Sequence, residues 1–234
     1  PQIIGKEIST TNQLQKILQP FKGNEFAKSA FDTAWWDAHA ISLQKPLWRL
    51  IGGKSPNVSV GADIPVLPNV TVLIERISEA VSQGFPRVKL KFNRTCSFAM
   101  IAAVREKFPD LVMHIDCNSG FTLDDAELFR ELDQLNLKMI EQPLGYDDLV
   151  YHAKLQKELK TPICLDESIT SLARAAKAIE IKACGWINIK TSRVGGLTNA
   201  LAIHDLCKSH DMPNWVGGML ESAVGQGPSL ALAT

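Results

Sequence analysis

Short apolar runs alternate along most of the chain with segments whose apolar residues recur at helical spacing. This alternation predicts repeated strand–helix units and therefore a parallel sheet. The seven strands that we expect are Val58–Gly61, Arg87–Phe92, Val112–Ile115, Lys138–Ile140, Ile163–Leu165, Trp186–Ile189 and Pro213–Val216. The helices that we expect after them span about 70–83, 97–107, 123–134, 147–159, 171–181, 196–209 and 222 to the end.

The first fifty residues follow a different pattern, because they contain helical signals and no strand signal. Residues 9–19 begin with Ser-Thr-Thr-Asn, which is good N-cap chemistry and predicts a short helix. Glu25–Leu43 is rich in alanine and periodic, which predicts a longer helix that ends before Gly52-Gly53. An eight-stranded β/α barrel needs one strand more than the seven expected here.

Three acidic residues stand at one interval, each directly after a short apolar run: Asp116, Glu141 and Asp166 are each 25 positions apart. Lys91 comes one interval earlier, and Lys190 about one interval later. An interval of this size is the length of one strand–helix unit. Five chemically active side chains at the ends of successive strands predict an active site at the carboxyl-terminal mouth of a parallel barrel.

A single acid after a strand is more often a helix N-cap or a solvated loop residue than a ligand. Three acids at a constant interval, with a lysine before the first and another after the last, favour a functional site instead. Two aspartates and a glutamate offer only oxygen ligands, which suits Mg²⁺, with Mn²⁺ as a possible substitute. Lys89 and Lys91 share one face of their strand, so both are expected to point inward. The alternative is a solvated edge strand with exposed lysines.

Composition narrows the class of protein. The chain has 234 residues, 45% hydrophobic and 21% charged, and 25 basic residues balance 25 acidic ones. This zero net charge gives no electrostatic footprint for nucleic acid or an anionic membrane, and no run of 18 apolar residues predicts a membrane span. Five cysteines without a C-x-x-C pair, and histidines without ligand spacing, disfavour disulfides and zinc. Reduced thiols favour a cytoplasmic protein.

A divalent cation that faces two lysines suits one kind of chemistry. Removing a proton α to a carboxylate builds negative charge on the carboxylate oxygens, which a cation stabilises while a lysine takes the proton. Lys91 and Lys190 come from the second and sixth expected strands, so they could flank a small-molecule carboxylate from opposite faces. The residues therefore predict an enzyme that abstracts an α-proton.

As a set, the motifs resemble the enolase superfamily, muconate-lactonizing subgroup, and within it the o-succinylbenzoate synthases and N-succinylamino acid (N-acylamino acid) racemases. The matching motifs are Lys89-Leu-Lys91, Asp116-Cys-Asn118, Ile-Glu141-Gln-Pro, Leu-Asp166-Glu-Ser, Ile-Lys190-Thr-Ser-Arg193-Val-Gly-Gly and Gly217-Gly-Met-Leu-Glu221. This resemblance implies that the three acids are the metal ligands. It also implies that Lys91 and Lys190 are the acid/base lysines.

The resemblance implies two possible reactions. As a synthase (a lyase), the protein would carry out a syn dehydration of a cyclohexadiene carboxylate in menaquinone biosynthesis. Lys91 would take the α-proton and return it to the departing hydroxyl, while Lys190 stays protonated. As a racemase (an isomerase), the protein would use the two lysines alternately as base and acid.

Two other interpretations are a truncated barrel without activity and a sugar-phosphate enzyme that binds phosphate at Gly217-Gly218.

Several further residues are candidates for supporting roles, each with a plainer alternative. Lys89 would place a second positive charge beside Lys91, or serve as a structural ion-pair partner. Asn118 would orient a ligand or contact substrate, or be a turn residue. Arg193 would pair with a substrate carboxylate or act on Lys190, or lie solvated in a loop. The remaining candidates, which would support the ligands from behind or bind an anion at a helix start, are Glu167, Glu221 and Gly195-Gly196.

The chain departs from the family in its extent. Members carry an N-terminal capping domain and a final barrel strand, and the sequence contains neither pattern. We therefore expect an α/β fold: an incomplete TIM-type barrel of the enolase superfamily, with seven strands. Residues 1–53 would be a helical linker from the missing capping domain, and residues 54–234 the barrel domain, truncated at its C-terminal end. The open sheet edge of such a barrel favours a partner chain, such as a second copy in a homo-oligomer.

Overall fold

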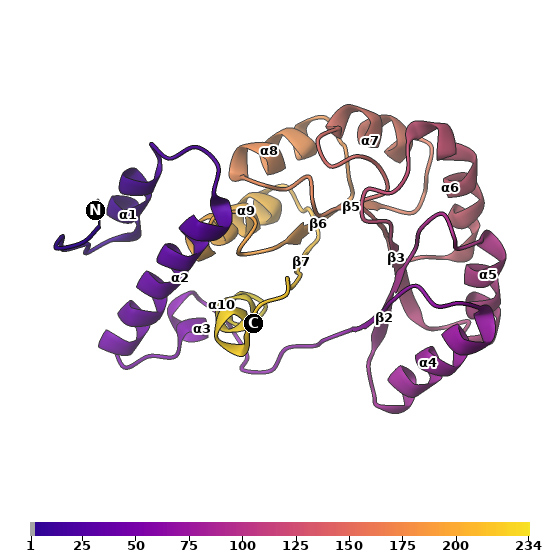
Figure 1. Ribbon diagram of the computed structural model, residues 1–234, viewed down its shortest axis with the longest axis horizontal. Helices are drawn as coiled ribbons and strands as arrows, with labels where there is room; N and C mark the ends of the chain where they lie inside the picture. The colour runs from indigo at the N-terminus through magenta and orange to yellow at the C-terminus, as the bar shows by residue number, and fades with distance from the viewer. Residues whose placement is uncertain (1–2) are drawn as a thin grey trace. The chain divides into compact units, whose positions relative to one another are not determined.

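The computed structural model describes residues 3–234 as an α/β fold whose seven strands form one sheet in the order β1 to β7 (Figure 1). Neighbouring strands from β1 to β6 pair in parallel. The strands are β1 (Ala62–Ile64), β2 (Arg87–Lys91), β3 (Val112–Asp116), β4 (Ile140–Glu141), β5 (Ile163–Leu165), β6 (Trp186–Ile189) and β7 (Asn214–Val216). The expected order of seven strands is confirmed.

Helices separate the strands, as the periodicity predicts. Three precede the sheet: α1 (Thr11–Leu18), α2 (Glu25–Ser42) and the unpredicted short α3 (Leu47–Leu50). Those between or after the strands are α4 (Val70–Ser82), α5 (Phe98–Lys107), α6 (Ala126–Leu132), α7 (Leu149–Gln156), α8 (Leu172–Glu180), α9 (Leu197–Ser209) and α10 (Ala223–Leu232). Short 3₁₀ turns at Leu123–Asp125 and Asp133–Leu135 flank α6, in place of one continuous helix.

The chain divides into two compact units. One comprises the N-terminal residues through Val58, with Ile169–Ala176 and Asn188–Thr234; the other comprises Ser59–Ser168 and Lys177–Ile187. We call them the first and the second unit. The first unit joins segments distant in sequence, so it does not follow the expected boundary at residue 53. That boundary, which separates a linker from a barrel domain, stays a prediction.

The second unit is built around strand β2, whose side chains alternate between two environments. Val88, Leu90 and the following Phe92 are at most 1% exposed. The apolar stripe of α4, including Leu73 and Ile77, is buried against this part of the sheet. Burial of such side chains contributes about 1.5–3 kcal/mol each and fixes which face the lysines of β2 occupy.

The predicted position of the first strand is wrong. Strand β1 begins at Ala62, after the apolar alternation of Val58–Gly61, because a strand forms where a partner exists and Ala62 pairs with Val88. Val60, which falls in the predicted segment, is 50% exposed. Strand β4 is likewise shifted and includes Glu141, which pairs with Asp116. The apolar run alone did not predict that a strand would continue into a buried carboxylate.

A buried carboxylate connects α2 with α9 in the first unit. Asp32 is 0% exposed and accepts hydrogen bonds from the Thr198 amide (2.9 Å), the Thr198 hydroxyl (2.6 Å) and Gln15 Nε2 (2.9 Å). Burial raises the pKa of Asp32, and the bonds from Thr198 and Gln15 offset only part of this effect. The helix start at Gly195-Gly196 therefore faces a carboxyl group of the protein itself, the side chain of Asp32.

Replacing Asp32 with alanine should lower the free energy of unfolding by about 2 kcal/mol, because α9 loses its cap and buried donors lose their acceptor. Urea unfolding measures this difference. Asp37→Ala is the matched control, since Asp37 is exposed on the same helix and its loss should change stability by less than about 0.5 kcal/mol. Equal stabilities of the two variants would contradict this role of Asp32.

Candidate active site

The strand register brings the predicted site residues of the second unit to one face and one end of the sheet. Lys89 is the strand partner of His114, Lys91 of Asp116, and Asp116 of Glu141. Partners in parallel strands point to the same side, and residues two apart on one strand do so too. Lys91, Asp116 and Glu141 are the last residues of β2, β3 and β4, which are neighbours in the sheet. The expected carboxyl-terminal placement is confirmed for these three.

Two lysines converge on the buried carboxylates. Lys89 Nζ lies 2.7 Å from Asp116 Oδ2 and 3.3 Å from both carboxylate oxygens of Glu141. Lys91 Nζ lies 2.7 Å from the same Asp116 oxygen. Asp116, Glu141 and Lys89 are all buried, at 1%, 0% and 8% exposure. The alternative of a solvated edge strand is therefore wrong for β2, because Lys89 is buried and the strand has partners on both sides.

The charges in this cluster stabilise one another against burial. Burial alone disfavours the charged form of each group, yet Lys89 and Lys91 hold the pKa of Asp116 below its usual range. Burial likewise opposes ionisation of Glu141, but His114 and Lys89 keep the pKa of Glu141 lowered. Glu141 and Asp116 in turn hold the pKa of Lys89 above its ordinary value, despite the burial of its ammonium. Both carboxylates and the Lys89 ammonium are therefore charged at neutral pH.

Asn118 is a turn residue that also contacts the cluster. It has a φ of 44°, and its amide donates to Asp116 Oδ1 at 3.0 Å. Its side-chain oxygen accepts from Lys91 Nζ at 2.8 Å. Its Nδ2 donates to Glu167 Oε1 at 3.0 Å. Asn118 thus links Lys91 and Asp116 to Glu167, which lies beside Asp166 in the chain.

Asp166 directly follows β5 and is 0% exposed. Its position depends on Gln142, a residue that the sequence analysis did not single out. Gln142 Oε1 accepts from the amides of Asp166 (3.0 Å) and Ser168 (3.1 Å), while its Nε2 donates to Ser168 Oγ at 2.8 Å. Buried Gln142 therefore fixes the backbone on either side of Asp166. In the sequence, the only indication of this role was that Gln142 directly follows Glu141.

The remaining candidates lie in the first unit. Lys190 directly follows β6 and is 9% exposed. Arg193 is partly buried, and its Nη2 lies 3.8 Å from Met219 Sδ, so it is not a freely solvated loop residue. Glu221 accepts from the Met219 amide at 2.6 Å and from Ser192 Oγ at 3.5 Å. These contacts connect the loop after Lys190 to the loop after β7.

The glycine pair Gly217-Gly218 does not offer a ready phosphate site. The Gly217 amide already donates to the Ile189 carbonyl at 3.1 Å. A Cβ added to Gly217 would meet Asn188 Nδ2 at 2.7 Å, so glycine is needed there for close packing against β6. These contacts give Gly217 a structural role and disfavour the sugar-phosphate interpretation.

The donor chemistry of the second unit fits a hard divalent cation. Three buried carboxylates end or directly follow neighbouring strands, and oxygen ligands of this kind are those that Mg²⁺ prefers. As the side chains lie, however, no group of three or more His, Cys, Asp or Glu within residues 3–234 is arranged to hold a metal ion. The Lys89 and Lys91 ammonium groups lie against Asp116 instead. A cation would therefore compete with the two ammonium groups for this oxygen.

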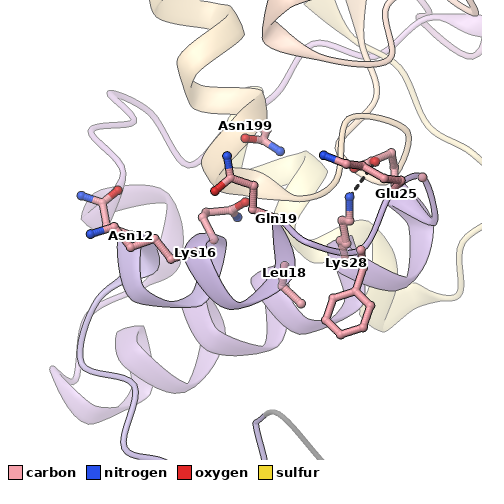
Figure 2. Close-up of a pocket in the computed structure, with 11 residues that line it drawn as sticks. Asn12, Lys16, Leu18, Gln19, Glu25, Lys28 and Asn199 are labelled. Carbon is pink, nitrogen blue, oxygen red and sulfur yellow. Dashed lines mark hydrogen bonds and ion pairs between the residues drawn. The ribbon is translucent and has the colours of Figure 1, made fainter.

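A separate cleft of about 530 Å³ lies in the first unit, between α1, the start of α2 and Asn199 of α9 (Figure 2). Its lining is mostly polar, and Lys28 in it is paired with Glu25 at 2.9 Å. It contains none of the sequence-predicted site residues.

Within the described residues, no helix is both long enough and apolar enough to cross a membrane.

Comparisons with known proteins show which family the chain belongs to. Residues 72–234 match the family model described as "Enolase C-terminal domain-like", and residues 1–52 match that of the "Mandelate racemase / muconate lactonizing enzyme, N-terminal domain". The resemblance predicted from the motifs is confirmed.

Named relatives and solved structures agree with the family match. The chain is 43% identical to an o-succinylbenzoate synthase of Geobacillus stearothermophilus and 41% identical to an N-succinylamino acid racemase of Thermus thermophilus. All of the chain aligns, but it spans only 62% and 63% of these relatives. The crystal structure of an enolase superfamily member from Listeria innocua superimposes with a TM-score of 0.94 at 41% identity, over 97% of this chain and 62% of that one.

Proposed function

Because the chain belongs to the family described as enolase C-terminal domain-like, we propose that it removes a proton α to a carboxylate and acts as an o-succinylbenzoate synthase. One observation carries this proposal: Lys91, Asp116 and Glu141 end three neighbouring strands and contact one another directly or through Lys89. The substrate would be a small carboxylate, the cyclohexadiene carboxylate that is dehydrated in menaquinone biosynthesis.

We assign the divalent cation, Mg²⁺ with Mn²⁺ as a substitute, to Asp116, Glu141 and Asp166. Bound there, it would neutralise the negative charge that develops on the substrate carboxylate. The register partnership of Asp116 with Glu141 and the place of Asp166 on the next strand support this assignment. The Asn118 amide donates to the Asp116 carboxylate, and Gln142 accepts from the Asp166 amide and so fixes the backbone that carries the third carboxylate.

Lys91 is the base in this proposal. Its ammonium group is held by Asp116 Oδ2 and Asn118 Oδ1, so the side chain is fixed at the carboxyl-terminal end of β2. As the neutral amine, Lys91 would take the α-proton and return it to the departing hydroxyl, which leaves as water. Lys190, at the end of β6, would stay protonated and donate to the developing enediolate. Burial of Lys190 is consistent with a role inside the protein, not at its surface.

An N-succinylamino acid racemase is the second candidate, favoured by the 41% identity to the Thermus thermophilus relative. The same two lysines would then work on opposite faces of the α-carbon. One would remove the proton and the other would deliver one, so that the configuration inverts. Residues 1–53 would join the barrel to capping structure in either enzyme, which the N-terminal family match over residues 1–52 supports. We also propose that the protein forms a homo-oligomer.

Two substrates tested side by side distinguish the candidates. With Mg²⁺, the synthase should convert the cyclohexadiene carboxylate to its aromatic product, which ultraviolet absorbance follows. The racemase should invert N-succinyl amino acids, which chiral chromatography follows. Turnover of both would mean that one site serves both reactions. Turnover of neither, by a protein that binds Mg²⁺, would contradict both assignments.

A further inference from the structure

The proposed reaction leaves a buried histidine in the second unit without a role. His114 lies on β3 and is 1% exposed, two residues before Asp116 and therefore on the same face. Its Nε2 lies 3.3 Å from Glu141 Oε2, so the ring is in close contact with this carboxylate. In a buried, low-dielectric environment a polar contact of this kind is electrostatically stronger than in water.

The contact between His114 and Glu141 comes from a residue that precedes Asp116 on β3. Asp116 is the strand partner of Glu141, and His114 is one layer earlier on β3, where its own partner on β2 is Lys89. Glu141 is thus contacted by two donors, the Lys89 ammonium and the His114 ring, each at 3.3 Å. Lys89 is also bonded to Asp116 at the shorter distance of 2.7 Å. A cation that bound Asp116 would disturb the lysine contact more than the histidine contact.

We propose that His114 is a positioning residue that holds Glu141 in the orientation needed to bind the divalent cation, with Nε2 donating a hydrogen bond to Glu141 Oε2 in the cation-bound site. This inference rests on the proposed function, because it takes Glu141 to be a cation ligand. The ring needs its hydrogen on Nε2 to act as the donor. Groups that orient a metal ligand in this way typically change metal affinity about 10- to 100-fold when they are lost.

The test measures Mn²⁺ and Mg²⁺ affinity by calorimetry, with no substrate present. His114→Leu keeps much of the volume but donates nothing, so it should weaken binding about 10- to 100-fold. His114→Gln can still donate to Glu141 and should bind within about threefold of the wild type, whereas the shorter His114→Asn should resemble His114→Leu. His204→Leu, on α9 of the first unit, is the control and should bind as the wild type does.

The outcomes separate this role from the cation site itself. If the wild type binds a cation and His114→Leu binds it equally well, His114 has no positioning role. If the wild type binds none, the cation site fails and this role fails with it. If His114→Leu does not fold, the comparison of His114→Gln with His114→Asn decides: equal affinities overturn the proposal, and weaker binding by His114→Asn alone supports it.

Discussion

Replacing Lys91 with alanine should lower turnover about 100- to 10,000-fold, the usual contribution of a positioned general base. The fold should persist, because Asp116 keeps its 2.7 Å ion pair with Lys89 when Lys91 is lost. Lys190→Ala should have an effect of similar size if both lysines act on the substrate. Ultraviolet assay of dehydration measures each loss, and circular dichroism checks that the variants are folded.

Deuterium exchange separates the roles of the two lysines. With N-succinyl amino acids in D₂O, each enantiomer presents its α-proton to one face, so each variant should lose exchange of the enantiomer that its missing lysine serves. Proton NMR of the separate enantiomers records this. Lys107→Ala, at an exposed position of α5, is the matched control and should exchange both at the wild-type rate. Wild-type turnover by Lys91→Ala or Lys190→Ala would contradict the assignment of that lysine.

Replacing Glu141 with glutamine should abolish the stabilisation that Mg²⁺ gives to the wild type and lower turnover at least about 100-fold. The substitution keeps the shape of the side chain but removes a negative charge from a residue that is 0% exposed. At a cation concentration 100 times Kd, binding adds about 2.7 kcal/mol to the stability of the wild type. The variant should show no such gain, which thermal unfolding with and without Mg²⁺ measures.

Glu131→Gln provides the control for this prediction, because Glu131 is exposed on α6 and its charge should not affect Mg²⁺ binding. The variant Glu141→Gln will also be less stable without Mg²⁺, since Lys89 and His114 lose a charged partner. A Mg²⁺-induced gain in Glu141→Gln equal to that of the wild type would contradict the role of Glu141 as a ligand.

The sequence predicted the strand-end positions of the candidate residues in the second unit, because the relevant information is local. The 25-residue interval reflects the length of a strand–helix unit, so it places Asp116 and Glu141 at strand ends without knowledge of the tertiary structure. Alternation along β2 gave the shared face of Lys89 and Lys91 for the same reason. Each of these inferences used the sequence around a single strand and needed no information about the neighbouring strands.

The features that sequence reasoning missed depend on contacts between distant segments. Whether β1 begins at residue 58 or 62 is decided by its pairing with β2, which the apolar pattern of the segment does not contain. Asp32 caps a helix that begins more than 160 residues later, at the glycine pair that had suggested an anion site. The roles of His114 and Gln142 depend on side-chain conformations in a packed interior. None of these contacts produces a periodic pattern in the sequence from which it could be predicted.

The most direct test of the account is a titration of the wild-type protein with Mn²⁺, followed by electron paramagnetic resonance. The central claim is that Asp116, Glu141 and Asp166 bind one hard cation. The account predicts that the wild type binds about one Mn²⁺ per chain, that Mg²⁺ displaces it, and that Asp166→Asn loses most of this binding. A wild type that binds no Mn²⁺, or an Asp166→Asn variant that binds it unchanged, would contradict the claim.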